Sequence, residues 1–255
     1  MQYSEFYRKY KRIFIMTDQL KRVEHKYYIA TKYVDDLKYC LSKILLEDKN
    51  NKSLSGYKIT SLYFDTPDDH DLNQKLNGVI FREKYRIRVY DKNSLFGKFE
   101  IKRKLNQTIE KYSLKLAIED IQNIISGDYS SIERNEEFAY VAKRMAYKQY
   151  TPKSIVEYHR HAYYLPLNNI RVTIDSNLSN YGFKDNFLNI DNLIPNQVMR
   201  HGHDILEVKF NGTMPRYILD ILSSFPIRQS AISKYALSRI DSNTEPQGDS
   251  PEIPF

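Results

Sequence analysis

The sequence predicts an α+β fold in which about eight antiparallel strands close into a β-barrel tunnel, with helices packed on its outside. Three observations predict this fold class. About eight segments alternate in hydrophobicity with a period of two, and helical patterns lie between them. In several of the strands, moreover, the charged residues fall on one face.

The strand candidates are short runs in which apolar and polar residues alternate. They lie at about residues 21–30, 57–65, 79–91, 95–105, 108–114, 154–166, 170–176 and 204–211. Asp91-Lys92-Asn93-Ser94 is a turn signal between two long candidates, so we expect these two strands to pair as a hairpin. About eight strands suffice to close a small barrel.

Helical periodicity occupies the spaces between the strands. Apolar residues recur at helical spacing at about residues 34–47, 118–125, 136–149, 215–224 and 232–239. At the two ends of the chain, residues 1–20 are predicted to form a basic arm and residues 241–255 a disordered tail. One domain, over residues 21–240, is therefore expected between them.

Composition limits the possible functions before any motif is considered. With 255 residues, of which 41% are hydrophobic, the chain can bury one large core. Its net charge of +7 favours an anionic partner such as phosphate, nucleic acid or a membrane surface. The lone cysteine, Cys40, excludes an internal disulfide framework, and no apolar run reaches the ~20 residues of a membrane span. We therefore expect a cytoplasmic protein.

The strand faces separate charged from apolar side chains, because alternate residues of a strand point to opposite sides of the sheet. In the strand at 79–91, Lys84, Arg86 and Arg88 share one face. Tyr85 and Ile87 lie on the other face. The triplet Glu-x-Lys also recurs on strands far apart in the sequence, as Glu24-His25-Lys26, Glu100-Ile101-Lys102 and Glu207-Val208-Lys209.

Two interpretations of these charged faces are open. Each face could simply meet water, as in most antiparallel sheets, and a single Glu-x-Lys pair could be a surface ion pair. Their recurrence favours instead an interior in which the charged faces oppose each other while the apolar faces pack against helices. Such an interior costs several kcal/mol of desolvation per ion unless it is filled, so a polyanion with bound metal is the expected occupant.

Several short motifs occur in an order that resembles a known family. They are Arg22-Val-Glu-His-Lys-Tyr, Ser61-Leu-Tyr-Phe-Asp-Thr, Arg86-Ile-Arg-Val-Tyr, Glu100-Ile-Lys, Tyr158-His-Arg, Arg171-Val-Thr-Ile-Asp, Leu206-Glu-Val-Lys and Ser233-Lys-Tyr. From about Arg22 to Arg239 the chain resembles the VTC domain, the polyphosphate polymerase domain of the yeast vacuolar transporter chaperone and its bacterial relatives. The resemblance implies the closed antiparallel tunnel of the CYTH-like triphosphate tunnel metalloenzymes.

The resemblance also implies a set of site residues. Those implied to hold phosphate during catalysis are Lys26, Arg86, Arg88, Lys102, Arg160, Arg171 and Lys234. Further phosphate-binding positions that we infer are Arg22, Lys104, Lys111, Lys209 and Ser233. Glu207 resembles the metal-binding glutamate of the family, and Glu100 and Glu24 are additional candidate ligands for Mn²⁺ or Mg²⁺.

One position departs from the wider superfamily. Its adenylate cyclase and thiamine triphosphatase members begin with Glu-x-Glu-x-Lys, and here the first of those positions is Arg22. A cation thus replaces one metal-binding carboxylate, which favours polymerase over hydrolase chemistry. In the expected reaction, the terminal oxygen of a polyphosphate chain attacks the γ-phosphate of ATP and releases ADP.

Two other functions stay open at this stage. The same tunnel could hydrolyse triphosphate or polyphosphate, or it could bind polyphosphate without catalysis. Nucleic acid is not expected, because the tyrosines of the strand at 79–91 lie opposite Arg86 and Arg88 and cannot stack bases on that surface. The expected partners are ATP and polyphosphate, and a membrane-associated partner protein is compatible with a sequence that contains no membrane span.

Overall fold

The computed structural model describes residues 22–90, 95–105, 108–181, 187–190, 193–199 and 202–240, except for the side chain of Arg22. The predicted arm at 1–20, the predicted tail at 241–255 and the predicted turn at 91–94 lie outside these ranges. The strands within them form one 11-stranded sheet whose paired neighbours are antiparallel.

Long strands alternate with short helices along the chain. The strands are β1 Arg22–Ala30, β2 Leu46–Glu47, β3 Tyr57–Asp65, β4 Phe81–Val89, β5 Phe96–Leu105, β6 Thr108–Ala117, β7 Thr151–Leu165, β8 Ile170–Tyr181, β9 Asn196–Gln197, β10 His203–Asn211 and β11 Arg228–Gln229. The helices are α2 Val34–Ser42, α3 His70–Leu76, α4 Ile118–Ile125, α5 Ser130–Glu133, α6 Ala139–Tyr147, α7 Arg216–Ser223 and α8 Lys234–Arg239. None of these helices has the length and apolar character that crossing a membrane requires.

The long strands and most helices lie where the hydrophobic periods predict them. The predicted hairpin is confirmed, since β4 pairs with β5 and Arg86 lies opposite Glu100. Helix α3 was not predicted, because the Asp and Pro residues before it indicate a turn and its seven residues are too few for a clear period. The two-residue strands β2, β9 and β11 are also too short to have a period.

The sheet is open, so the predicted closed barrel is wrong. The strand order is β11-β1-β10-β8-β7-β3-β4-β5-β6, and within the described ranges β6 and β11 each pair on one side only. A barrel closes only when its first and last strands pair. The alternation of side chains shows which residues share a face of a strand, but not which strands pair at their edges. The sequence pattern therefore could not show whether the sheet closes.

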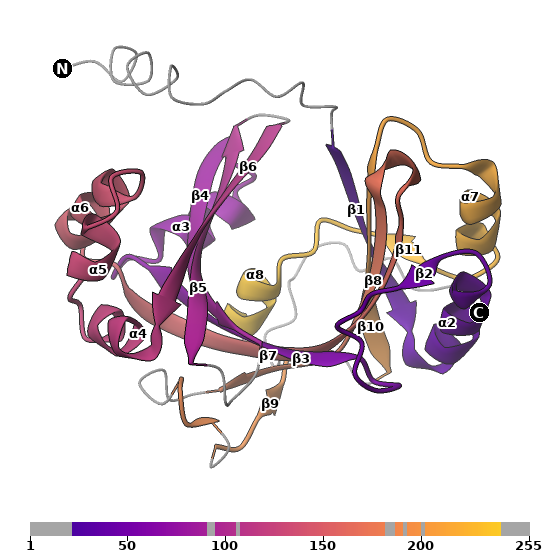
Figure 1. Ribbon diagram of the computed structural model, residues 1–255, viewed down its shortest axis with the longest axis horizontal. Helices are drawn as coiled ribbons and strands as arrows, with labels where there is room; N and C mark the ends of the chain where they lie inside the picture. The colour runs from indigo at the N-terminus through magenta and orange to yellow at the C-terminus, as the bar shows by residue number, and fades with distance from the viewer. Residues whose placement is uncertain are drawn as a thin grey trace.

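The sheet bends into a trough instead of a barrel (Figure 1). Strands β7 and β3 form the floor, β4, β5 and β6 form one wall, and β8, β10 and β1 form the other. The register of β7 shifts against β8 between Glu157 and His159, and against β3 between Tyr63 and Phe64. Such bulges bend strands, which helps the floor to turn upward into two walls.

Hydrophobic cores hold helices on the outside of both walls (Figure 1). Helices α4, α5 and α6 cover the outer face of the β4–β6 wall, where Tyr85 and Phe99 pack in one cluster with Ile121. Helices α2 and α7 cover the other wall, where Leu37 and Val172 share a second cluster. Because the apolar faces point outward to the helices, the charged faces point into the trough.

Helix α8 lies inside the trough, between the two walls (Figure 1). Its apolar residues Tyr235 and Ala236 pack in a third cluster with Ile59 and Tyr158 of the floor. The helix and the residue before it thereby bring Ser233 and Lys234 next to the charged strand faces.

Candidate functional site

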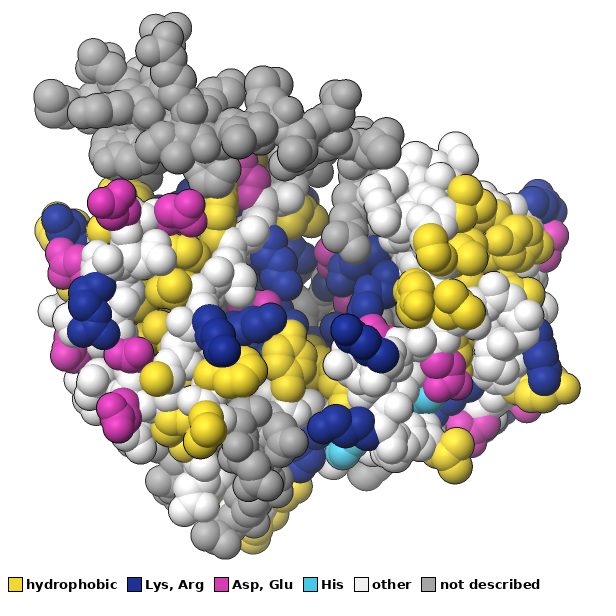
Figure 2. All heavy atoms as spheres, viewed as in Figure 1, with side chains coloured by type: hydrophobic (Ala, Val, Ile, Leu, Met, Phe, Trp, Pro, Cys, Tyr) yellow, Lys and Arg dark blue, Asp and Glu magenta, His cyan; other side chains and the backbone are white. Residues whose placement is uncertain are grey.

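The trough holds a large cavity lined by charged residues. Its volume is about 1910 Å³, and its lining comes from both walls, the floor and α8. Within the part of the chain that the structure describes, thirteen Lys and Arg side chains and three Glu side chains line it, so positive charge is in large excess. Figure 2 shows part of this lining as blue side chains in the hollow between the two lobes.

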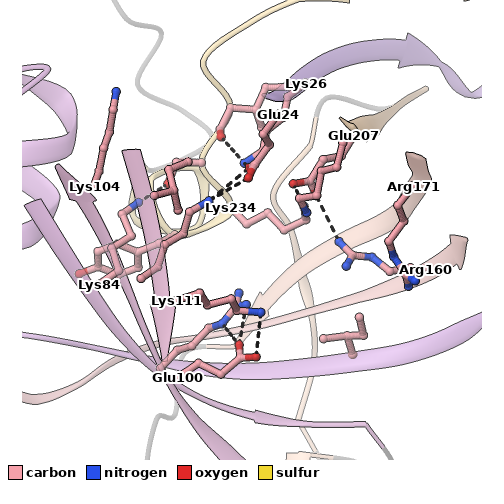
Figure 3. A pocket seen from close by; sticks show the side chains of 18 of the residues that line it. Glu24, Lys26, Lys84, Glu100, Lys104, Lys111, Arg160, Arg171, Glu207 and Lys234 are labelled. Atoms are coloured by element: carbon pink, nitrogen blue, oxygen red, sulfur yellow. Dashed lines mark hydrogen bonds and ion pairs between the residues drawn. The ribbon is translucent and has the colours of Figure 1, made fainter. Parts of the chain in front are cut away.

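The structure brings the predicted site residues together. Those that line the cavity are Lys26, Arg86, Arg88, Lys102, Lys104, Lys111, Arg160, Arg171, Lys209, Ser233 and Lys234, with the carboxylates Glu24, Glu100 and Glu207. Arg22 lies in β1 opposite Asn211, and its side chain is outside the described part of the chain. Figure 3 shows labelled side chains that line the cavity from both walls, from the floor (Arg160) and from α8 (Lys234).

Glu100 of β5 is the centre of a cation cluster on the β4–β6 wall. Arg86 donates from Nε to Glu100 Oε2 at 2.7 Å, and Lys111 Nζ lies 3.2 Å from Oε1. Arg88 Nε lies 3.6 Å from Oε2. Burial alone would raise the pKa of the Glu100 carboxyl, but Arg86, Arg88 and Lys111 lower it to about 2. Both carboxylate oxygens are therefore already engaged by cations.

Carboxylates and lysines alternate across the register of β1 and β10. Glu24 lies opposite Lys209, and Lys26 lies opposite Glu207. Lys26 Nζ is 3.1 Å from Glu24 Oε1, and Lys209 Nζ is 2.6 Å from Glu207 Oε1. Burial would raise the pKa of the Glu207 carboxyl, but Lys209 and Lys26 hold it well below its ordinary range. From the opposite wall, Lys102 reaches Glu24 Oε1 at 3.2 Å.

Asp175 of β8 holds two predicted phosphate-binding residues in place. Arg160 donates from Nε and Nη2 to the two oxygens of Asp175, each at 2.6 Å. Lys234 Nζ lies 2.6 Å from Oδ2 of the same carboxylate. Burial would raise the pKa of the Asp175 carboxyl, but Arg160 and Lys234 lower it to about 2. Asp175 thus fixes a floor residue and an α8 residue relative to one wall.

Arg171 is positioned by a loop before β3. Its Nη1 lies 2.6 Å from Asp48 Oδ2, and its Nη2 donates to Tyr57 Oη at 3.3 Å. Gly56 in this loop has φ +85°, and a Cβ there would lie 2.0 Å from the carbonyl oxygen of Arg160. Only glycine fits this close approach, which holds the loop against β7.

Buried hydrogen bonds from the turn after β3 hold α8 in the trough. Tyr235 Oη donates to Asp65 Oδ2 at 2.7 Å, and Arg239 Nη2 donates to Asp69 Oδ2 at 2.7 Å. Asp65 also accepts from the backbone N–H groups of Thr66, Asp71 and Leu72 at 2.8 to 2.9 Å. The Asp-Thr-Pro-Asp-Asp segment therefore forms a turn, as its residue types indicate, and its carboxylates also anchor α8.

Several charged residues of this network were not among the predicted site residues. Arg82, Lys84 and Asp175 lie on the same alternating faces as predicted residues, so the strand period could have found them. Asp48 lies in a loop and Lys75 in α3, and no local pattern indicates that either approaches the site. Contacts of this kind depend on the tertiary fold.

Glu24 and Glu207 are the carboxylates that best fit a divalent metal. They occupy diagonal positions on adjacent strands and face the same cavity. Burial and the charge of Glu207 both act to raise the pKa of Glu24, although Lys26 and its neighbours hold it below its ordinary value. Mg²⁺-type ions are commonly held by one or two carboxylates together with substrate phosphates. The described residues contain no group of three His, Cys, Asp or Glu side chains for a metal, so phosphate and water would complete the shell.

Comparison with known proteins gives one family. The sequence profile of the VTC domain matches residues 21–240, which is most of the chain. No curated protein sequence is similar enough to count as a match. The profile match covers the strands of both walls and α8.

Comparison with solved structures finds two putative adenylyl or adenylate cyclases. A putative adenylyl cyclase from Hippeastrum, described as having a dominant triphosphatase activity, is 18% identical with a TM-score of 0.53. The match covers 86% of this chain and 95% of that chain. A putative adenylate cyclase from Bacillus halodurans is 13% identical with a TM-score of 0.45, and covers 84% of this chain and 95% of that chain. The first likeness shows a shared fold.

Proposed function

We propose that this chain, which belongs to the VTC domain family, is an ATP- and metal-dependent polyphosphate polymerase. Family membership supports an activity on triphosphate or polyphosphate. The observation that carries the proposal is the excess of cations that line the cavity, thirteen Lys and Arg against three Glu among the described residues. A polyanion compensates such an excess. The Glu24 and Glu207 pair suits the metal that accompanies ATP.

The two kinds of cation have different proposed roles. Arg86 and Arg88 present forked donors that suit two phosphate oxygens each, whereas Lys102 and Lys234 act as point charges. In the protein alone, Glu100 and Asp175 hold three of these cations in place. Phosphate oxygens therefore meet donors that are already oriented, which lowers the entropy cost of binding.

The proposed reaction transfers the γ-phosphoryl group of ATP. A terminal oxygen of the polyphosphate chain attacks the γ-phosphorus and forms a new P–O–P bridge. The bond from the γ-phosphorus to the β,γ-bridging oxygen breaks, and ADP leaves with that electron pair. Since the attacking oxygen is ionised at neutral pH, no general base is required, and the protein supplies positioning and charge neutralisation.

Glu207 and Glu24 would hold Mn²⁺ or Mg²⁺, which would supply positive charge for phosphoryl transfer. In the protein alone these carboxylates are paired with Lys26 and Lys209. If the carboxylates bound a metal ion, both amines would be available to phosphate. The alternation of lysines and glutamates on β1 and β10 supports this proposed exchange of partners.

Incubation with ATP, Mn²⁺ and a short polyphosphate primer tests the proposal. The expected products are ADP and polyphosphate longer than the primer, in amounts that match each other. Omitting the metal, or replacing Glu207 by Gln, is expected to abolish both products. Absence of polymer from folded, ATP-binding protein would contradict the polymerase.

A second candidate function is hydrolysis of triphosphate in the same cavity. It is favoured by the fold shared with a protein described as having a dominant triphosphatase activity. Water would then replace the chain end as the nucleophile. Hydrolysis gives free phosphate without polymer, so the products of the same incubation separate the two candidates.

A further inference from the structure

The cavity differs in chemistry between the two ends of β4. Arg82 and Lys84 lie near the start of the strand, and Tyr90 directly follows its end. Lys84 and Tyr90 are six residues apart, which is roughly 20 Å at about 3.3 Å per residue. All three residues line the same cavity. The first end is cationic, and the second has an accessible aromatic ring.

Four cations form the cationic end: Lys75, Arg82, Lys84 and Lys104. Among the residues that the structure describes, no carboxylate contacts any of them. Arg82 lies opposite Lys104, and Lys84 lies opposite Lys102, so like charges face each other across β4 and β5. Such like-charge pairs destabilise a sheet, so a bound anion would stabilise this end of the cavity.

Lys84 contacts uncharged groups through its amine. Its Nζ donates to Ser233 Oγ at 2.8 Å and lies 5.8 Å from the centre of the Tyr235 ring. Burial, followed by the charges of Lys26 and Lys75, lowers the pKa of Lys84 to about 7. An anion at this position would restore the protonated amine.

Two tyrosines form the aromatic end. The ring centres of Tyr57 and Tyr90 are 6.4 Å apart, and 39% of Tyr90 is exposed. Arg88 Nη1 donates to Tyr90 Oη at 3.3 Å, and Arg171 Nη2 donates to Tyr57 Oη at 3.3 Å. A base stacked on the exposed ring would place its phosphates beside these two arginines.

We propose that the cavity orients its substrates, with the base of the nucleoside triphosphate at Tyr57 and Tyr90 and the polyphosphate chain at the cationic end. The inference rests on the function proposed above. A base is uncharged and stacks on aromatic rings, whereas a chain without metal is anionic throughout and is favoured where no carboxylate repels it. Lys102, beside Lys84, reaches Glu24 and so connects the cationic end to the proposed metal site.

Three ligands and one variant at each end test the orientation. Binding of ATP, tripolyphosphate and long-chain polyphosphate is measured in EDTA, so that no turnover occurs. Tyr90→Ala is expected to weaken ATP about tenfold while both inorganic ligands change by less than about twofold. Lys84→Met is expected to lower the affinity for long-chain polyphosphate more than the affinity for ATP. For polyphosphate, the slope of the logarithm of the binding constant against the logarithm of the salt concentration should become shallower by about one.

Matched variants control for indirect effects. Tyr90→Phe keeps the ring, so it is expected to bind ATP like the wild type. Lys143→Met removes an exposed lysine of α6, outside the cavity, and is expected to leave all three affinities unchanged. If Lys84→Met fails to fold, Lys104→Met tests the same end, because Lys104 is only partly buried.

The outcomes separate this inference from the proposed function. The orientation would be overturned if Tyr90→Ala lowered the affinities for ATP and tripolyphosphate equally. It would also be overturned if Lys84→Met lowered the affinities for all three ligands equally, or lowered the affinity for ATP more than that for long-chain polyphosphate. If the expected pattern appears but ATP and Mn²⁺ yield no polymer, the polymerase fails and the orientation stands. If polymer forms without the pattern, the polymerase stands and the orientation fails.

Discussion

The two walls of the cavity differ in how their cations are balanced. Among the described residues, the β4–β6 wall presents one carboxylate to the cavity, Glu100, among many cations. That carboxylate is bound by Arg86 and Lys111. The β1–β10 part of the other wall alternates Glu24 and Glu207 with lysines. The first wall therefore favours a bound anion, whereas the second also carries the two carboxylates that we propose to hold a metal ion.

This difference separates two roles for buried carboxylates that look alike in sequence. Glu-x-Lys triplets occur on both walls. Glu100 orients the cations that contact it, whereas Glu207, which contacts Lys209 and Arg160, is the carboxylate that we propose to bind a metal in exchange for Lys209. A pair of identical substitutions, one on each wall, tests whether the two carboxylates have these different roles.

The largest effect is expected from Glu207→Gln. Loss of this carboxylate should remove the proposed metal site and lower turnover by about a thousandfold or more, because charge stabilisation by a metal is worth several kcal/mol. Tripolyphosphate binding without metal should persist, since the cations stay. Steady-state turnover of ATP across a range of Mn²⁺ concentrations measures the first effect, and calorimetric binding in EDTA measures the second. Turnover that retains its dependence on Mn²⁺ would place the metal elsewhere.

The matching change on the other wall is Glu100→Gln. It leaves Arg86, Arg88 and Lys111 close together without their shared carboxylate, so the free energy of unfolding should fall by about 3 kcal/mol. Tripolyphosphate should recover most of this loss, because its oxygens replace the carboxylate. Urea unfolding with and without tripolyphosphate measures both quantities. A variant as stable as the wild type, or one that tripolyphosphate stabilises no more than the wild type, would contradict the orienting role.

The sequence contained most of the charge pattern of the walls but not the shape of the sheet. Alternation placed Lys84, Arg86 and Arg88 on one face, because the period of a strand is local. Closure depends on which strand edges meet, so no local pattern could reveal the open trough. The prediction that the tyrosines at 79–91 lie opposite Arg86 and Arg88 is confirmed for Tyr85, which packs in the core, but it is wrong for Tyr90, which lines the cavity beside Arg88. Tyr90 is two residues after Arg88, so the period of the strand places both on one face. The roles of Asp48 and Lys75 depend on contacts distant in sequence.

A smaller effect is expected from pH on the β4–β6 wall. Burial and neighbouring cations lower the pKa of Lys84 to about 7, and burial lowers that of Lys111 to about 8. As the pH rises past these values the amines lose protons, so polyphosphate affinity should fall roughly tenfold between about pH 6 and 9. Stability without ligand should change in the opposite direction, since the unfolded chain keeps these lysines protonated to about pH 10 and binds more protons.

Calorimetric binding and urea unfolding over this pH range measure the two trends. Lys84→Met should flatten both curves in the lower half of the range, because the lower of the two pKa values belongs to Lys84. An affinity that is constant from pH 6 to 9 would show that neither amine loses its proton in contact with the chain.

The smallest effect concerns α8, which joins the two walls. Lys234 contacts Asp175 on one side, and Ser233 accepts from Lys84 on the other. Tyr235→Phe removes the hydrogen bond to Asp65, so stability should fall by about 1 to 2 kcal/mol. Since both contacts depend on the placement of α8, kcat should also fall, by about threefold, with little change in KM for ATP.

Tyr129→Phe is the matched control, because it also removes a hydrogen bond from a buried tyrosine, but to the backbone of Tyr150 in the core outside the β4–β6 wall. It should lower stability by a similar amount and leave kcat unchanged. If the two variants affect kcat alike, α8 only stabilises the fold. If only Tyr235→Phe lowers kcat, the hydrogen bond from α8 to the end of β3 positions α8 for catalysis. It would then set the spacing between the β4–β6 wall and the wall that carries the proposed metal site.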